Sequence, residues 1–203
     1  IATGEPPFEA FWLKALKNHP YLSSLITEAD EELLSKLIDI KLTYLDDTTG
    51  FKLDFVFAEN DFVENQIIGK TYFLENVKEA HFQNLLFDRT ETSEIKWKSG
   101  KNLCMKEVTK TQRHKASGVM RTVSKSVETE SFFLFFDETR SPADDEEIDE
   151  EALAEIEEGI HVDLELGNIF KLSIIPRAYD WFTGKALDYE EMGSDIGSCD
   201  DFS

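Results

Sequence analysis

A repeated alternation of apolar and polar residues in the first third of the chain constrains the fold most strongly. Large apolar side chains alternate with polar ones over 40–44 and again over 51–57, and residues 46–50 have the composition of a turn. Because successive side chains of a strand point to opposite faces of a sheet, this spacing predicts two antiparallel strands with one buried, aromatic face. A third strand is expected over 67–74 and a fourth at 95–97.

Helical spacing of apolar residues predicts the elements that cover this face. The run over 8–16 follows two prolines, and Pro20 ends it. A second helix is expected after Thr27, whose hydroxyl can cap it in a capping-box-like arrangement, with an apolar stripe over 33–38. Further helices are expected over 81–88, 144–158 and 169–182, the last interrupted at Pro176.

The net charge of the chain restricts its partners. The 42 acidic residues outnumber the 21 Lys and Arg residues, which gives a formal charge of −21. A field of this sign repels nucleic-acid phosphates and anionic membrane surfaces and attracts basic proteins. No run approaches the ~18 apolar residues of a membrane span. The two cysteines, Cys104 and Cys199, form no CxxC pattern, which favours a reducing compartment.

Two segments depart from the average charge in opposite directions. Residues 101–127 have Glu107 as their only acid, and Gly118 lies between two weakly alternating arms, which predicts a protruding basic hairpin. Such a hairpin could serve nuclear import or self-association, or be merely an exposed edge. Residues 144–158 contain ten acids and no Lys or Arg, with apolar residues at helical spacing, which predicts an acidic helix with one apolar edge. The basic candidates are Lys106, Lys110, Arg113, Lys115, Arg121 and Lys125.

The motifs of enzymes and metal sites are absent from the sequence. Carboxylates are numerous, but none is isolated in a way that would select an acid/base pair, which disfavours a carboxylate hydrolase. The four histidines are isolated from one another, and GxSxG and glycine-rich phosphate loops do not occur. We therefore expect no catalysis, no cofactor and no metal. An acidic surface can simply provide solubility, but acidity spread beyond one run favours a receptor for a basic protein.

Short motifs follow one another in a fixed order along nearly the whole chain. They are FWLKALKN at 11–18, ITEADE at 26–31, GFKLDF at 50–55, KTY at 70–72, EIKW at 94–97, ESFF at 130–133, IPRA at 175–178 and DWFTG at 180–184. Together they resemble the nucleosome assembly protein (NAP/SET) family of histone chaperones. The WFTG ending resembles the nucleosome-assembly branch, whereas NHP at 18–20 and IKWKSGK at 95–101 look closer to the SET branch.

The resemblance implies an α+β fold, with an antiparallel sheet on one side and helices that form an acidic underside. It implies ATP-independent, non-catalytic chaperoning of core histones in nucleus and cytoplasm. Direct binding of nucleic acid or membrane is not expected, because of the negative charge. It also implies a homodimer of the full-length protein through an N-terminal helix missing from this chain. The alternative is an acidic inhibitor of the SET type with a non-histone client.

The resemblance also suggests boundaries and contact residues. We expect the histone-binding domain over 1–187 and an acidic, flexible end over 188–203. The acids of the capped helix and of the acidic run are expected to face the histone. They are Glu28, Asp30, Glu31, Asp144, Asp145, Glu146, Glu147, Asp149, Glu150 and Glu151.

Overall fold

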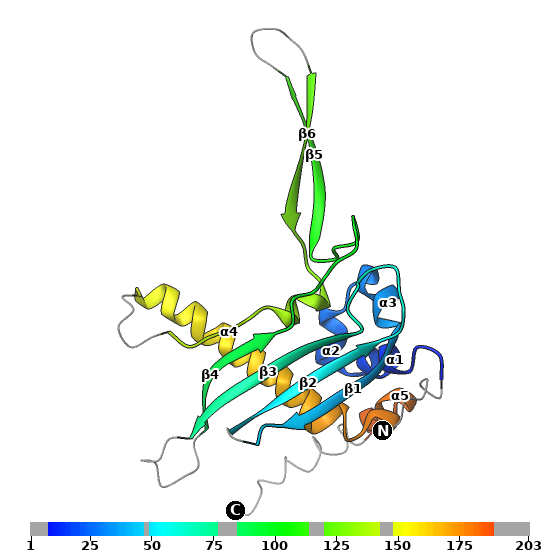
Figure 1. The fold of residues 1–203 in the computed structure, drawn as a ribbon, viewed down its shortest axis with the longest axis vertical. Helices are drawn as coiled ribbons and strands as arrows, with labels where there is room; N and C mark the ends of the chain where they lie inside the picture. Colours follow the sequence, from blue (N-terminus) through cyan, green and yellow to red (C-terminus); the bar gives the residue numbers. More distant parts are fainter. Residues whose placement is uncertain (1–7, 47–48, 77–84, 114–119, 143–147, 189–203) are drawn as a thin grey trace, which may run out of the picture.

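A four-stranded antiparallel sheet forms the body of the protein, and a separate two-stranded hairpin projects from it (Figure 1). The computed structural model describes residues 8–46, 49–76, 85–113, 120–142 and 148–188. The strands of the sheet are adjacent in chain order, and consecutive strands pair antiparallel. They are β1 (Leu37–Tyr44), β2 (Thr49–Phe57), β3 (Ile67–Asn76) and β4 (Leu85–Thr92). The α+β fold with an antiparallel sheet is therefore confirmed.

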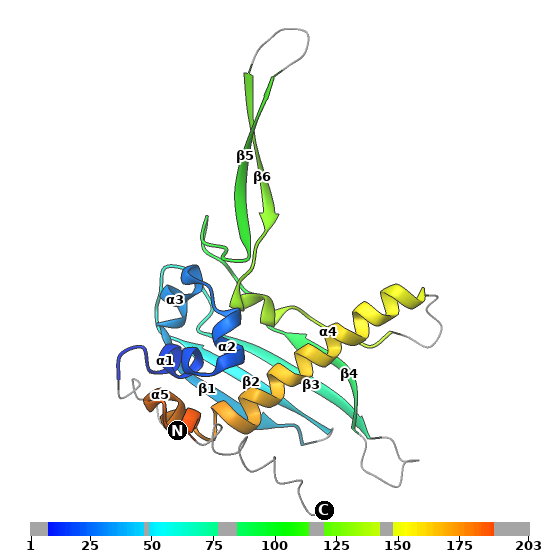
Figure 2. The same ribbon diagram turned by 180° about the vertical axis from the view of Figure 1, so that it is seen from behind.

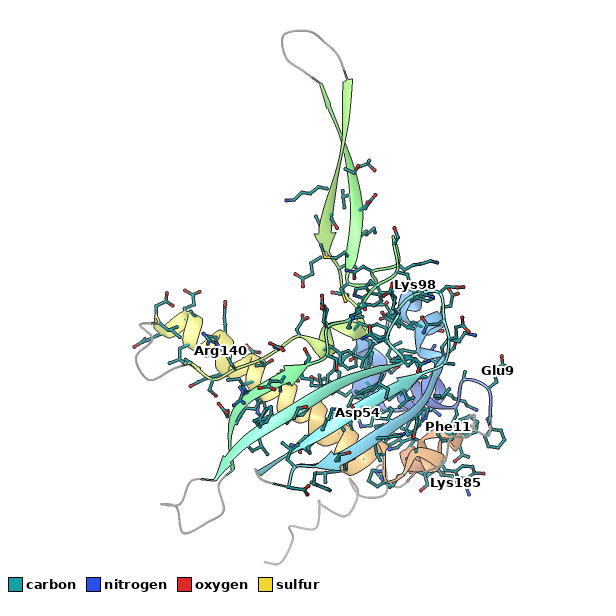
Figure 3. The ribbon with its side chains drawn as sticks, viewed as in Figure 1. Glu9, Phe11, Asp54, Lys98, Arg140 and Lys185 are labelled. Atoms are coloured by element: carbon teal, nitrogen blue, oxygen red, sulfur yellow. The ribbon has the colours of Figure 1, made fainter. Side chains whose placement is uncertain are left out.

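The helices cover one face of this sheet, as the two opposite views show (Figures 1 and 2). Three short helices precede the sheet, and the other helical segments follow the hairpin. The opposite face of the sheet is open and carries Asp54 (Figure 3). The Asp54 carboxylate pairs with Lys52 at 2.8 Å. The helical segments are α1 (Phe11–Asn18), α2 (Pro20–Leu25), α3 (Glu28–Leu34), the 3-10 helix η1 (Phe132–Phe136), α4 (Glu150–Asn168), the π-helix η2 (Ile169–Ile174) and α5 (Ala178–Thr183).

The core lies between the aromatic face of the sheet and the helices. Phe55 of β2 is fully buried, and its ring lies edge-on against Phe136 of η1 and Phe170 of η2, with centroid distances of 5.1 Å to each. This is the geometry that aromatic pairs prefer, and burying such a side chain contributes about 1.5–3 kcal/mol. The alternation predicted over 51–57 thus forms the centre of the core.

The first and last helices of the body pack against each other. The Asn18 side-chain amide donates to the Trp181 carbonyl oxygen at 2.7 Å, and the Trp181 indole, fully buried, donates to the Ser173 carbonyl oxygen at 3.2 Å. A break near Pro176 was predicted, and the structure has one, since η2 ends at Ile174 and α5 begins at Ala178.

Two of the predicted elements are wrong. Residues 85–88 of the expected helix over 81–88 belong to β4, and residues 81–84 lie outside the described part. The expected strand at 95–97 is only a single bridge between Val63 and Trp97. Strand β4 is held from both sides, because it pairs with β3 and the Thr90 amide donates to the Thr139 carbonyl oxygen at 2.7 Å. This pairing, from a distant segment, overrides the local pattern.

The N-terminal helices also differ from the prediction. Proline at the first position begins α2, which is compatible with helix geometry because the missing N–H has no helical partner there. Helix α3 ends at Leu34, so that Leu37 and Ile38 belong to β1 rather than to the apolar stripe of a helix.

The predicted basic hairpin is present. Strands β5 (Met105–Arg113) and β6 (Met120–Glu128) pair from Met105 with Glu128 to Arg113 with Met120, and they extend away from the body (Figure 1). Lys106 and Lys125 are exposed. Lys115 and Gly118 lie outside the described residues, as do the side chains of Lys110, Arg113 and Arg121.

Candidate functional site: an acidic helical face

Helix α4 contains more acidic residues than any other described helix on this side of the sheet. The Asp149 carboxylate caps it by accepting from the Ala152 amide at 2.8 Å, and two further acids occupy the first turn, where the helix dipole favours negative charge. The helix contains no Lys or Arg, and its N-terminal turns extend past the edge strand β4 (Figures 1 and 2). Its exposed acids are Glu150, Glu151, Glu155, Glu157, Glu158 and Glu165.

The acidic run predicted over 144–158 is therefore described in part. Residues 150–158 are helical, as expected, and Asp149, Glu150 and Glu151 are exposed. Asp144, Asp145, Glu146 and Glu147 lie outside the described residues.

The C-terminal half of α4 is anchored to the sheet through Asp163. The Lys70 ammonium lies 2.8 Å from Asp163 Oδ1 and also donates to the carbonyl oxygens of Phe135, at 2.6 Å, and Asp137, at 2.9 Å. The Tyr72 hydroxyl lies 3.0 Å from Asp163 Oδ1. A Cβ atom on Gly167 would lie 2.6 Å from the Tyr72 ring, so glycine allows this close approach of helix and sheet.

Burial shifts the pKa values of Lys70 and Tyr72, which hold α4 against β3. Desolvation lowers the pKa of Lys70, while the charge of Asp163 opposes that shift. Desolvation, reinforced by Asp163, raises the pKa of Tyr72 well above its usual value. Sequence reasoning missed Lys70 as a structural residue. Its signal was the inward position of a lysine in β3, two residues from the buried Ile68 and Tyr72.

Asp30, one of the predicted contact residues, is buried. Asp30 is 0% exposed, and its carboxylate accepts from the Thr27 amide at 2.9 Å, the Ser131 hydroxyl at 2.6 Å and the Phe132 amide at 2.9 Å. It completes the capping box of α3 and ties that helix to η1. A carboxylate enclosed in this way has no contact with an external partner. This corrects the expectation that Asp30 faces the histone.

The other two acids predicted on α3 remain accessible. Glu28 is exposed, whereas Glu31 pairs with Lys17 at 2.6 Å and keeps 39% of its side-chain surface exposed. Helices α3 and α4 lie on the same side of the sheet (Figure 2). Of the predicted acids, the structure therefore presents Glu28 and Glu31 of α3 on this side, together with Asp149, Glu150 and Glu151 at the start of α4.

Asp137, which follows η1, carries a charge that its surroundings disfavour. Desolvation and the nearby Glu128 raise its pKa, and Lys70 only partly opposes the shift. Between the usual carboxyl pKa and this raised value the folded state binds more protons than the unfolded state, so stability falls as pH rises through that window. We expect Asp137→Asn to leave the melting temperature unchanged near pH 3 and to raise it at pH 7.

The measurement is thermal unfolding of both proteins across this pH range. Glu155→Gln, which removes one charge from the exposed face of α4, is the control for net charge. An Asp137→Asn effect that is independent of pH, or equal to that of the control, would contradict the interpretation.

Within the described ranges, no helix is long and apolar enough to cross a membrane. In the same part of the chain, no three or more His, Cys, Asp or Glu side chains are placed to hold a metal ion together.

A helix-covered antiparallel sheet with a projecting hairpin and an acidic longest helix defines an α+β domain of strongly negative charge. The family model described as Nucleosome assembly protein (NAP) matches residues 2–185. This chain belongs to the nucleosome assembly protein family, which confirms the resemblance seen in the motifs.

Two comparisons give the extent of the similarity. The chain is 39% identical over 187 residues to Nucleosome assembly protein 1;2 of Nicotiana tabacum, which covers 91% of this chain and 48% of the relative. Nucleosome Assembly Protein 1 from Plasmodium knowlesi has a similar structure, with a TM-score of 0.67 and 33% identity, over 87% of this chain and 68% of that one. The chain thus spans about half the length of the curated relatives it matches.

Proposed function

We propose that this chain is the histone-binding part of a histone chaperone, which binds core histones through the acids of α4 and α3 and mediates their deposition on, or removal from, DNA without catalysis. Membership of the nucleosome assembly protein family supports this function. The observation that carries it is the exposed run of acids on α4, a helix with no Lys or Arg.

The physical basis of the proposal is competition for positive charge. Histones are rich in Lys and Arg, which otherwise bind DNA phosphates non-specifically. An acidic surface neutralises part of that charge and releases the histone only where a complete nucleosome is more stable. Each exposed ion pair contributes about 0.2–1 kcal/mol, so many pairs are needed, and salt should weaken the complex.

The first test is the binding of purified core-histone pairs across a salt series, with a non-histone protein of similar positive charge beside them. We expect tight, salt-sensitive binding that favours the histones. Equal binding of both would overturn histone specificity and favour the alternative, an acidic inhibitor of the SET type with another client.

A charge variant tests the acidic run itself. Replacing Asp144, Asp145, Glu146, Glu147, Glu150 and Glu151 by their amides removes six charges and keeps Asp149, which caps α4. At ~0.2–1 kcal/mol for each exposed pair, we expect the histone dissociation constant to rise by about tenfold or more at low salt. The slope of affinity against salt concentration should also become shallower, which isothermal titration calorimetry at several salt concentrations would measure.

The matched control removes six charges from the C-terminal segment, residues 188–201. Asp188, Glu190, Glu191, Asp195, Asp200 and Asp201 replaced by their amides change the net charge equally. We expect this control to bind histones nearly as wild type does. If both variants lose affinity equally, net charge alone acts; if a folded α4 variant keeps its affinity, the assignment of this run is wrong.

The remaining predictions concern the whole protein. We propose that it moves between nucleus and cytoplasm and forms a homodimer, with the domain ending near 187. Two roles for the basic hairpin stay open, nuclear import and self-association, and the exposed Lys106 and Lys125 are available to either.

A further inference from the structure

A cavity of about 500 Å³ lies between α2, η1 and α4. Buried residues, among them Lys70, Phe135 and Asp163, form its floor, whereas exposed residues such as Glu130 and Gly159 lie at its rim. The cavity therefore opens on the side of the sheet that carries the acidic helix, and α4 forms one of its walls.

The charges that line the cavity do not balance. Three carboxylates, those of Glu130, Asp137 and Asp163, face a single ammonium group, that of Lys70. The Lys70 ammonium already uses its three donors, because it is bonded to Asp163 Oδ1 and to two carbonyl oxygens. Its side chain is 1% exposed. The lining thus has an excess of negative charge.

One buried oxygen in this lining has no partner. The Asp163 side chain is 9% exposed. Its Oδ1 atom pairs with the Lys70 ammonium and accepts a hydrogen bond from the Tyr72 hydroxyl. Oδ2 is buried and accepts no hydrogen bond from any described residue. Buried polar atoms are nearly always bonded, so an unpaired carboxylate oxygen in the wall of a cavity indicates a site for a hydrogen-bond donor.

We propose that this cavity receives a lysine or arginine side chain of the bound basic protein, with the alkyl stem against the apolar lining and the cationic group among the three carboxylates. The inference rests on the proposed function for the identity of that protein, a core histone. Burial and Glu128 raise the pKa of Asp137, and the charge of Lys70 opposes this shift only in part.

The mixed lining favours this class of side chain over others. Apolar groups of Leu25, Leu134 and Val162 line the same space. Lysine and arginine combine a stem of three or four methylene groups with a terminal cation, and so match both parts of the lining. A free anion would be repelled, and a purely apolar side chain would leave Asp163 Oδ2 unpaired.

Gly159 allows the cavity to be blocked without changing any charge. A Cβ atom at this exposed helical position meets no atom within 4 Å, and alanine is a better helix former than glycine. Gly159→Ala therefore keeps the cavity open and serves as the matched control. We expect Gly159→Trp to close the rim and to raise the histone dissociation constant roughly tenfold, as the loss of one anchored side chain does. Gly159→Ala should bind as wild type.

A second measurement addresses the cavity without histones. Titration of the protein with n-butylammonium, which mimics the lysine side chain, should shift the NMR signals of Val162 and Leu166, whereas n-butanol should shift them less. Gly159→Trp should abolish the response to n-butylammonium. This readout remains decisive if Gly159→Trp is too unstable for the histone experiment, because wild type can be titrated alone.

The outcomes separate the inference from the proposed function. If wild type prefers histones but Gly159→Trp binds them as Gly159→Ala does, the cavity is not used and the inference is overturned. Absence of shifts with n-butylammonium overturns it as well. If wild type shows no preference for histones, the proposed function fails, and shifts with n-butylammonium would still support a cation site.

Discussion

Replacement of Asp30 by alanine is expected to destabilise the domain by about 3–5 kcal/mol, although this residue belongs to a conspicuous acidic cluster. The change leaves the buried Phe132 amide, the buried Ser131 hydroxyl and the partly buried Thr27 amide without their common acceptor. Each buried donor without a partner costs about 1–3 kcal/mol. Urea unfolding followed by circular dichroism measures the difference in unfolding free energy.

The neighbouring Glu31 is the control for Asp30. Its carboxylate pairs with Lys17 at the surface, so that Glu31→Ala should cost less than about 1 kcal/mol. In histone binding the order should reverse, with Glu28→Ala and Glu31→Ala weakening the complex and the folded fraction of Asp30→Ala binding normally. A stable Asp30→Ala protein with weakened histone binding would restore the role first expected from the sequence.

Lys70→Met is expected to destabilise the protein by a similar amount, about 3–5 kcal/mol. The substitution leaves the Asp163 carboxylate buried beside Tyr72 without its ammonium partner and removes one of the links between α4 and β3. Chemical denaturation at pH 7 measures the loss. Lys52→Met is the matched control, since Lys52 pairs with Asp54 on the open face of the sheet and should cost less than about 1 kcal/mol (Figure 3).

A double variant distinguishes a lost ion pair from lost packing. Lys70→Met combined with Asp163→Leu removes both charges, and replacing a buried pair by apolar residues is often nearly neutral. We expect the double variant to be more stable than Lys70→Met alone. A double variant that is less stable than the single one would show that the hydrogen bond between Tyr72 and Asp163 matters more than the unpaired charge.

Much of the fold could be predicted from local patterns. The alternation in β1, β2 and β3, the basic arms of the hairpin and the acidic helix are properties of short segments, because period two and helical spacing are visible within ten residues. Strand β4 could not be predicted in this way, because its pairing with residues near Thr139 brings together segments about fifty positions apart.

The candidate site was predicted only in part. An acid in the first turn of a helix has the same local pattern whether it meets solvent or a distant segment. The capping box with Thr27 distinguishes Asp30 from Glu28 locally, but only the ESFF segment, a hundred residues later, buries it.

The sequence by itself determined the family, the alternating strands, the two oppositely charged segments and the acidic character of the helical side. Only the tertiary structure decided which of the charged residues are buried. It placed Asp30 under η1, joined Lys70 to Asp163 and left an acidic cavity between α2, η1 and α4. The physical reason is that periodicity and capping act over a few residues. Burial depends on which distant segments meet, and it separates a structural charge from one that is available to a partner.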